Sequence, residues 1–154
     1  MKISDYLIIS KKTITAYNKT CESVLEKYDI SQVSFDILMF LTNNPEYVTA
    51  QDISEIKGIK KNLVSVHVEK LVSAGLLERG FVSGDRRKVS LSCTEKARPI
   101  IEDGLAVQTS FYERITSGIT EEDWEAYKRI NKHVMENTDR KSTRLNSSHS
   151  MVSR

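Results

Sequence analysis

Residues 76–93 of this 154-residue chain read LLERGFVSGDRRKVSLSC. Here the apolar residues change from a helical to an alternating period, which predicts two short strands at residues 76–82 and 88–93. The segment between them, residues 83–87, combines Ser, Gly and Asp, which are typical of hairpin turns, with two arginines. We therefore expect a basic β-hairpin at this point of the chain.

Two short helices are expected immediately before the hairpin. Thr49, followed three residues later by Asp52, resembles a capping box and begins a helix that ends at Gly58. A further helix is expected from about residue 60 to residue 74, with Gly75 as its C-terminal stop. Because only about two residues separate the two helices, the pattern is that of a helix-turn-helix. The hairpin that follows makes it a winged helix-turn-helix in order and spacing.

Long helices are expected on both sides of this motif. Residues 2–28 contain neither Gly nor Pro and have apolar residues at helical spacing. Ser31 caps a second helix, which the sequence NNP at residues 43–45 ends. A fifth helix follows the hairpin and ends at residues 117–118, and Thr120 caps a sixth. The expected fold is mainly α with a small β-hairpin wing, a winged helix-turn-helix flanked by long N- and C-terminal helices.

The composition is that of a soluble globular protein, with 39% hydrophobic and 29% charged residues but only 6 Gly and 2 Pro. The longest unbroken apolar run, residues 37–41, is far shorter than the roughly 20 residues of a membrane-spanning helix. Two cysteines that lie far apart in the sequence indicate neither a disulfide framework nor a paired metal site. We therefore expect a cytoplasmic protein with no membrane partner.

Positive charge is concentrated in one segment. The whole chain has a net charge of +2, but residues 57–98 hold ten Lys or Arg and four Asp or Glu. A basic segment on an otherwise acidic body indicates one surface that faces a polyanion. The alternative on charge alone is a chance run of solvated side chains.

The sequence has none of the usual marks of an enzyme. It contains no glycine-rich phosphate loop, no paired metal-ligand motif and no nucleophile elbow. Before the C-terminal tail, its histidines are His67 and His133, and no pattern pairs them; His67 is expected to be packed or on the surface. We expect no catalytic residue, no metal site and no cofactor.

Residues 85–94, DRRKVSLSCT, resemble the wing signature of the MarR family of bacterial transcription regulators, an Asp, then an Arg, then Leu-x-Leu-Thr. Residues 71–79, LVSAGLLER, resemble the end of the family's recognition helix and its entry to the wing. Ile30-Ser31, Phe35 and Ile37-Leu38 fit the family's second helix, and the resemblance extends from residue 1 to about residue 137.

This resemblance implies a sequence-specific DNA-binding regulator that acts as a repressor. It would bind a near-palindromic operator in double-stranded DNA as a homodimer and be released by a small aromatic or lipophilic effector. The helix at residues 60–74 departs from the family pattern, because Lys60, Asn62-Leu63-Val64 and Val66 replace the usual Ser, Ser-Thr-Val and Arg.

The residues expected to contact DNA come from this helix and from the wing. Lysines at the N-terminal end of a helix suit phosphate, Asn62 can pair with adenine, and Val66 can meet a thymine methyl. Glu69 is expected to pair with a cation of the wing or of a helix. From the resemblance, Asp85 would orient the arginine beside it, and an arginine at the tip would enter the minor groove. The full set is Lys60, Lys61, Asn62, Ser65, Val66, Lys70, Asp85, Arg86, Arg87 and Lys88.

Residues 1–29 and 95–138 are expected to form the dimerisation helices, and residues 30–94 the DNA-binding region. The first and sixth helices have more apolar surface than a small winged domain hides, which indicates an interface. Its expected members are Ile3, Tyr6, Leu7, Trp124, Tyr127, Ile130 and Val134. Internal packing of both helices is the alternative.

Two other functions remain open at this stage. A winged helix can serve protein contact without specific DNA binding, and the missing recognition arginine favours this reading. A redox role is the other, since Cys21 has tyrosines at positions 17 and 28; a buried inert cysteine is the commoner case.

Residues 139–154 are expected to be a disordered tail. Residues 139–149, DRKSTRLNSSH, resemble a translated sequencing-library adapter, which indicates an assembly artefact. An ordinary polar C-terminal tail is the alternative.

Overall fold

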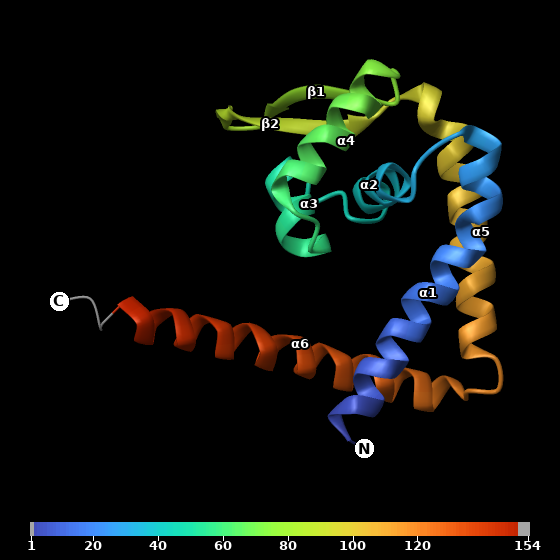
Figure 1. Ribbon diagram of the computed structural model, residues 1–154, viewed down its shortest axis with the longest axis vertical. Helices are drawn as coiled ribbons and strands as arrows, with labels where there is room; N and C mark the ends of the chain where they lie inside the picture. Colours follow the sequence, from blue (N-terminus) through green and yellow to red (C-terminus); the bar gives the residue numbers. More distant parts are fainter. Residues whose placement is uncertain (1, 151–154) are drawn as a thin grey trace. The chain divides into compact units, whose positions relative to one another are not determined.

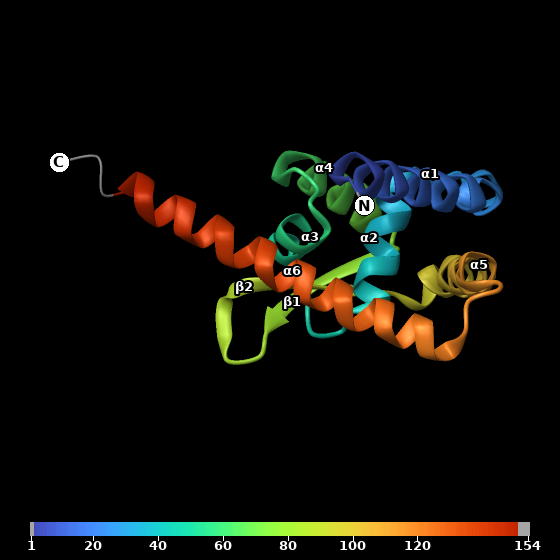
Figure 2. The ribbon, with the colours of Figure 1, turned by 90° about the horizontal axis from the view of Figure 1, so that it is seen from below.

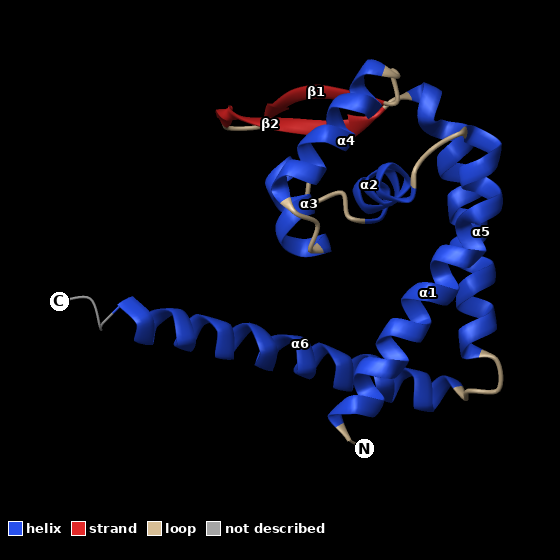
Figure 3. Cartoon of the chain, viewed as in Figure 1, coloured by secondary structure: helices blue, strands red, loops and turns tan. Residues whose placement is uncertain are grey.

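A computed structural model describes the backbone of residues 2–150 and the side chains of residues 2–138. The mainly helical architecture with one hairpin confirms the expected fold (Figures 1 and 3). The elements in chain order are α1 (Ile3–Tyr28), α2 (Gln32–Asn43), α3 (Ala50–Lys57), α4 (Lys61–Ser73), β1 (Leu77–Val82), β2 (Asp85–Cys93), the 3-10 helix η1 (Glu95–Ala97), α5 (Arg98–Thr116) and α6 (Glu121–Ser150).

The chain forms two compact units, residues 1–112 and residues 113–154. The first contains α1 to α4, the hairpin and most of α5, and the second contains α6. This boundary lies within α5, whereas the division expected between dimerisation and DNA-binding regions lies at residues 29 and 94. That functional division stays a prediction.

The core of the first unit is built around α2, which packs against α1, α3, α4 and β2. Phe35, Ile37 and Leu38 of α2 have no exposed surface, and Ile53 of α3 and Val64 of α4 lie in the same apolar cluster. Because α2 is buried nearly all round, it holds α3 and α4 in fixed positions.

The ends of α3 follow the capping prediction. Asp52 N donates to Thr49 Oγ1 at 3.1 Å, and Thr49 N donates to Asp52 Oδ2 at 2.9 Å. Burial alone would raise the pKa of Asp52, but the hydrogen bonds from Thr49 hold it below its ordinary value. Gly58 ends the helix with a φ of 75°, in the left-handed region that favours glycine.

The hairpin differs from its expected form in the length of its turn. β1 and β2 are antiparallel, with Leu77 opposite Cys93 and Phe81 opposite Val89, and an irregularity follows Phe81. The turn is only Ser83-Gly84, because Gly84 adopts a φ of 82° and reverses the chain in two residues. β2 therefore begins at Asp85 rather than at residue 88. Figure 2 shows the tip of the hairpin extending beyond α3 and α4.

Helix α6 also differs from expectation. Asp123 N donates to Thr120 Oγ1 at 3.2 Å, as the cap prediction requires. The backbone is then helical to Ser150, although residues 139–154 were expected to be disordered. This segment contains neither Gly nor Pro, the residues that most often end a helix. Residues 151–154 lie outside the described part, and the artefact hypothesis stays a prediction. Among the described residues, no helix combines the length and apolarity needed to cross a membrane.

Candidate nucleic-acid interface

The turn between α3 and α4 is fixed by a side-chain hydrogen bond. The Ser54 hydroxyl of α3 donates to the carbonyl oxygen of Ile59 at 2.7 Å. Ile53 of α3 is fully buried, and α3 packs directly against α4. The two helices therefore form a rigid helix-turn-helix, in which α4 has the place of a recognition helix.

Helix α4 separates a buried face from an exposed one, as its sequence pattern predicts. Val64, Val68 and Leu71 are nearly fully buried. The predicted DNA-contacting residues of this helix are all exposed; they are Lys61, Asn62, Ser65, Val66 and Lys70, with Lys60 at the N-cap. This face combines ammonium groups, an amide, a hydroxyl and an apolar side chain, the groups that read phosphates and base edges.

The wing presents a run of exposed cations. Arg86, Arg87 and Lys88 all lie on the first half of β2 and are exposed, and the Arg87 side chain is 94% exposed. Asp85 Oδ1 accepts from Arg87 N at 3.0 Å and from Arg87 Nε at 3.4 Å. The carboxylate thus orients the arginine two residues along, not Arg86 beside it as expected. Because β2 begins at Asp85 and side chains alternate along a strand, Asp85 and Arg87 lie on the same side and Arg86 lies on the other.

An ion pair connects the recognition helix to the wing. Arg79 Nη2 of β1 lies 2.7 Å from Glu69 Oε2 of α4. The expectation that Glu69 pairs with a cation of the wing or of a helix is thus confirmed, and the pairing neutralises the one acidic side chain of α4. The sequence does not indicate Arg79 as its partner, because the pairing depends on how the hairpin folds back on α4.

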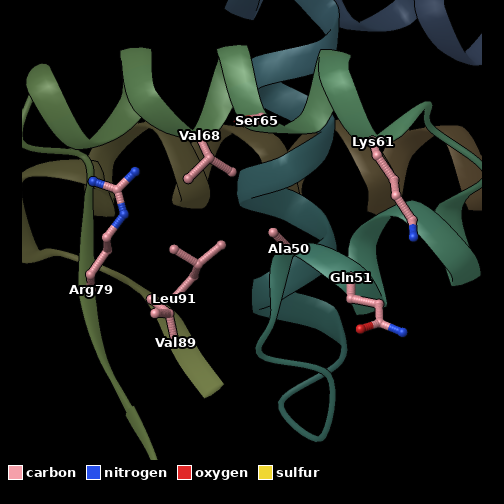
Figure 4. Close-up of a pocket in the computed structure, with 8 residues that line it drawn as sticks. All are labelled: Ala50, Gln51, Lys61, Ser65, Val68, Arg79, Val89 and Leu91. Atoms are coloured by element: carbon pink, nitrogen blue, oxygen red, sulfur yellow. The ribbon is translucent and has the colours of Figure 1, made fainter. Parts of the chain in front are cut away.

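A hollow of about 330 Å³ separates α4 from the hairpin and the start of α3. Figure 4 shows Val68, Val89 and Leu91 on its apolar side, and Arg79 on β1 with its guanidinium toward α4. Lys61 and Gln51 lie at its other end (Figure 4). The hollow therefore combines an apolar wall with two cationic groups, next to the exposed face of α4.

Cys21 lies in an environment that opposes redox reactivity. It has no exposed surface, and burial raises the pKa of its thiol. The neighbouring Tyr17 accepts a hydrogen bond from Gln108 Nε2 at 3.2 Å, and burial raises its pKa to about 12. A thiol that stays protonated and inaccessible is a poor nucleophile. The redox alternative gains no support from this geometry.

The residues predicted for a dimer interface leave apolar surface uncovered in each unit. In α1, Ile3 and Leu7 are 74% and 60% exposed, and Tyr6 is at 37%. In α6, Ile130 is 60% exposed, and Tyr127 stacks on the half-buried Trp124 with ring centroids 5.1 Å apart. Val134 is 38% exposed. These surfaces are suited to a partner chain, and their pairing stays a prediction.

The fold and this surface define a winged helix-turn-helix protein. A recognition helix held by a buried α2, a following hairpin with exposed cations and the ion pair between them are the parts of such a module. Among the residues whose side chains are described, no cluster of three or more His, Cys, Asp or Glu is placed to hold a metal ion.

Comparisons with known proteins agree with this class. Residues 28–88 match the sequence model of the MarR family. The chain is 26% identical over 114 residues to the HTH-type transcriptional regulator TcaR of Staphylococcus aureus, covering 73% of this chain and 74% of TcaR. It is 25% identical over 126 residues to the HTH-type transcriptional regulator PecS of Dickeya dadantii, covering 78% and 76%.

Solved structures share the fold. The MarR transcription regulator of Oenococcus oeni superposes with a TM-score of 0.68 at 23% identity, over 88% of this chain and 99% of that one. The S. aureus MepR–DNA complex superposes with a TM-score of 0.70 at 18% identity, over 90% and 96%. Residues 28–88 thus resemble the MarR family, and the curated proteins that the chain is similar to are named as transcriptional regulators.

Proposed function

We propose that the chain is a sequence-specific DNA-binding regulator that binds a near-palindromic operator as a homodimer. The observation that carries this proposal is the joint exposure of one face of α4 and of Arg86, Arg87 and Lys88 on β2, with an ion pair between Glu69 of α4 and Arg79 of β1. Helix α4 would enter the major groove, and the wing cations would lie along the minor groove and backbone.

Selection from a random duplex library, followed by fluorescence anisotropy, tests this function. We expect enrichment of an inverted repeat whose half-sites lie about one helical turn apart. Affinity for both operator and random DNA should fall as salt rises, with the operator retaining an advantage. Equal affinity for all duplexes, or no binding at low salt, would instead favour the protein-interaction alternative.

We further propose that an anionic, partly apolar small molecule acts as effector in the hollow between α4 and the hairpin. Val68, Val89 and Leu91 suit an aromatic or lipophilic body, while Arg79, at one end of the hollow, suits a carboxylate. An occupant there would separate Arg79 from Glu69 and thereby change the orientation of the wing relative to α4. Binding of a set of aromatic carboxylates, measured by calorimetry with and without operator, tests this. A ligand that weakens operator binding should itself bind less tightly to the complex, by the same factor.

We propose repression as the mode of action, because a bound dimer excludes other proteins from its operator. A reporter gene placed behind the selected operator tests this. Expression should rise when the regulator is deleted, and a fall would indicate activation.

A further inference from the structure

His67 is a buried histidine on the recognition helix that takes no part in the exposed face. It is 9% exposed and lies on the side of α4 that packs against α2. Its Nδ1 lies 2.8 Å from Ser34 Oγ and 3.3 Å from Ser31 Oγ. These contacts join the middle of α4 to the first turn of α2.

A neutral ring fits this arrangement. Ser31, the N-cap of α2, accepts from Ser34 N at 3.2 Å, so that its own hydroxyl hydrogen is available to donate. The hydroxyl of Ser34 is also a donor and is the nearer of the two, so an unprotonated Nδ1 can accept from it with its one lone pair. A protonated ring would present N–H there, and Ser34 would then have to turn and accept.

The charges around the ring oppose protonation. The N-terminal end of α2 is the positive end of its helix dipole, which repels a cation. Burial lowers the pKa of His67 below its ordinary 6.5, and the positive charge of Lys70, one turn along α4, lowers it further.

The remaining ionisable groups near the ring do not reverse this balance. Tyr28 and the exposed Asp29, at the end of α1, line the same surface hollow as Ser31, Ser34 and Lys70. Asp36, the carboxylate of α2, accepts instead from Gln32 at 2.9 Å and lies 3.9 Å from Lys57.

We propose that His67 is a positioning residue for the recognition helix. Its neutral imidazole, next to Ser34 and Ser31, sets the position of α4 on α2. Protonation of the ring releases α4 from this position and weakens operator binding. This inference rests on the proposed DNA-binding function. It concerns a residue on the buried side of α4, which does not itself contact the proposed DNA surface.

The direction in which operator affinity changes with pH distinguishes a positioning role of His67 from a simple attraction between a charged histidine and DNA. The stabilising contribution of the neutral ring is complete above pH 6.5 and is lost as the pH falls through the lower pKa of the folded protein. Affinity for the operator should therefore fall in acid. A histidine that only added positive charge near DNA would raise affinity in acid.

The test measures operator affinity of the full chain by fluorescence anisotropy at constant ionic strength, from about pH 7.5 to about pH 5.5. We expect the wild type to lose about fivefold or more in affinity, the usual lower range of coupling between two sites. His67→Gln stays neutral and should flatten the profile. His133→Gln, which changes an exposed histidine of α6, should retain the wild-type profile. A wild-type affinity that is constant or rises in acid, or a fall that His67→Gln preserves, would overturn the inference.

A measurement without any substitution guards against misfolding of the variant. If protonation opposes operator binding, operator binding must lower the pKa of His67 by the same coupling. Titration of the His67 ring by NMR in the free and operator-bound wild type measures this directly. An unchanged or raised pKa in the complex contradicts the inference.

The two proposals fail in different ways. Operator binding at about pH 7.5 without a pH response refutes the role of His67 alone. Absence of specific binding at every pH refutes both the proposed function and the positioning role.

Discussion

At the residue scale, neighbouring positions on α4 have opposite environments. Val66 is 51% exposed and His67 is 9% exposed, although they are adjacent in sequence. One face of the helix thus remains available for base edges while the other is bonded to α2. The contributions of single residues to affinity and to sequence choice can therefore be separated.

Asn62→Ala and Arg87→Ala are expected to affect DNA binding differently. Loss of the Asn62 amide should cost roughly 1–3 kcal/mol at the operator and little on random DNA, since a bidentate base contact is removed. Loss of the exposed Arg87 should weaken binding to both duplexes and lower the salt slope by about one, because one phosphate-type contact is lost. Anisotropy titrations across a salt series measure both. Parallel losses on both duplexes would show that α4 does not read bases.

Gly104 of α5 is a position where backbone and side chains approach closely. A Cβ at this position would lie 2.5 Å from Met39 Sδ and 3.0 Å from Phe35 Cε2 of α2. Gly104→Ala should therefore lower the free energy of unfolding by about 1–3 kcal/mol through overpacking, as measured by denaturant titration. In a chain that already carries Met39→Ala, Gly104→Ala should lower the free energy of unfolding by less than it does in the wild type, since the closest atom is gone. Additive losses in the double variant would rule out this contact as the cause.

Among the elements, α4 and the wing are joined by an ion pair between Glu69 and Arg79. Both side chains are largely exposed, at 64% and 42%. An exposed pair of this kind contributes little to stability, about 0–1 kcal/mol. Its effect is expected instead in the orientation of the wing and in the local charge that DNA meets.

Glu69→Gln should raise affinity for random DNA and steepen its dependence on salt. The substitution removes a negative charge from α4 and frees Arg79 for phosphate. The free energy of unfolding should change by about 1 kcal/mol or less. Glu78→Gln is the matched control, because it removes an exposed carboxylate from β1 that hydrogen-bonds with Ser92 instead. If both variants raise affinity equally, net charge rather than the ion pair is responsible.

At the scale of the whole molecule, the uncovered apolar surfaces of α1 and α6 predict self-association. Leu7→Glu and Ile130→Glu, made separately, should each shift the protein from dimer to monomer at micromolar concentration, since each would bury a carboxylate in the interface. Size-exclusion chromatography with light scattering measures the mass. Ile56→Glu changes an apolar residue of α3 that is 55% exposed and should leave the dimer intact. A wild type that is monomeric in these conditions would contradict the prediction.

Removal of residues 139–154 tests whether the end of the chain contributes to the fold. We expect the free energy of unfolding to change by no more than about 0.5 kcal/mol, as for surface changes without contacts. Operator affinity should also stay close to the full-length value after allowing for the lost positive charge. Circular dichroism during thermal unfolding is sufficient for the first measurement, and a larger loss would show that this segment packs.

The order and type of the elements can be predicted from the sequence, because local signals specify them. Thr49 and Asp52 cap α3, Gly58 ends it, and the change of period after Gly75 marks the hairpin. Capping hydrogen bonds, left-handed glycines and apolar spacing act over a few residues, so they are readable without knowledge of the fold. The exposed face of α4 was predictable for the same reason.

The contacts between residues far apart in the sequence become visible only in the folded protein. The partners of Glu69 and His67, Arg79 and the serines of α2, lie 10 and 33 or more positions away and carry no local signature. The pairing of Asp85 with Arg87 depended on where the hairpin turns, and a two-residue turn is chosen by the strand register as well as by its sequence. Such contacts follow from how helices and strands pack together, which is a property of the whole core rather than of any single segment.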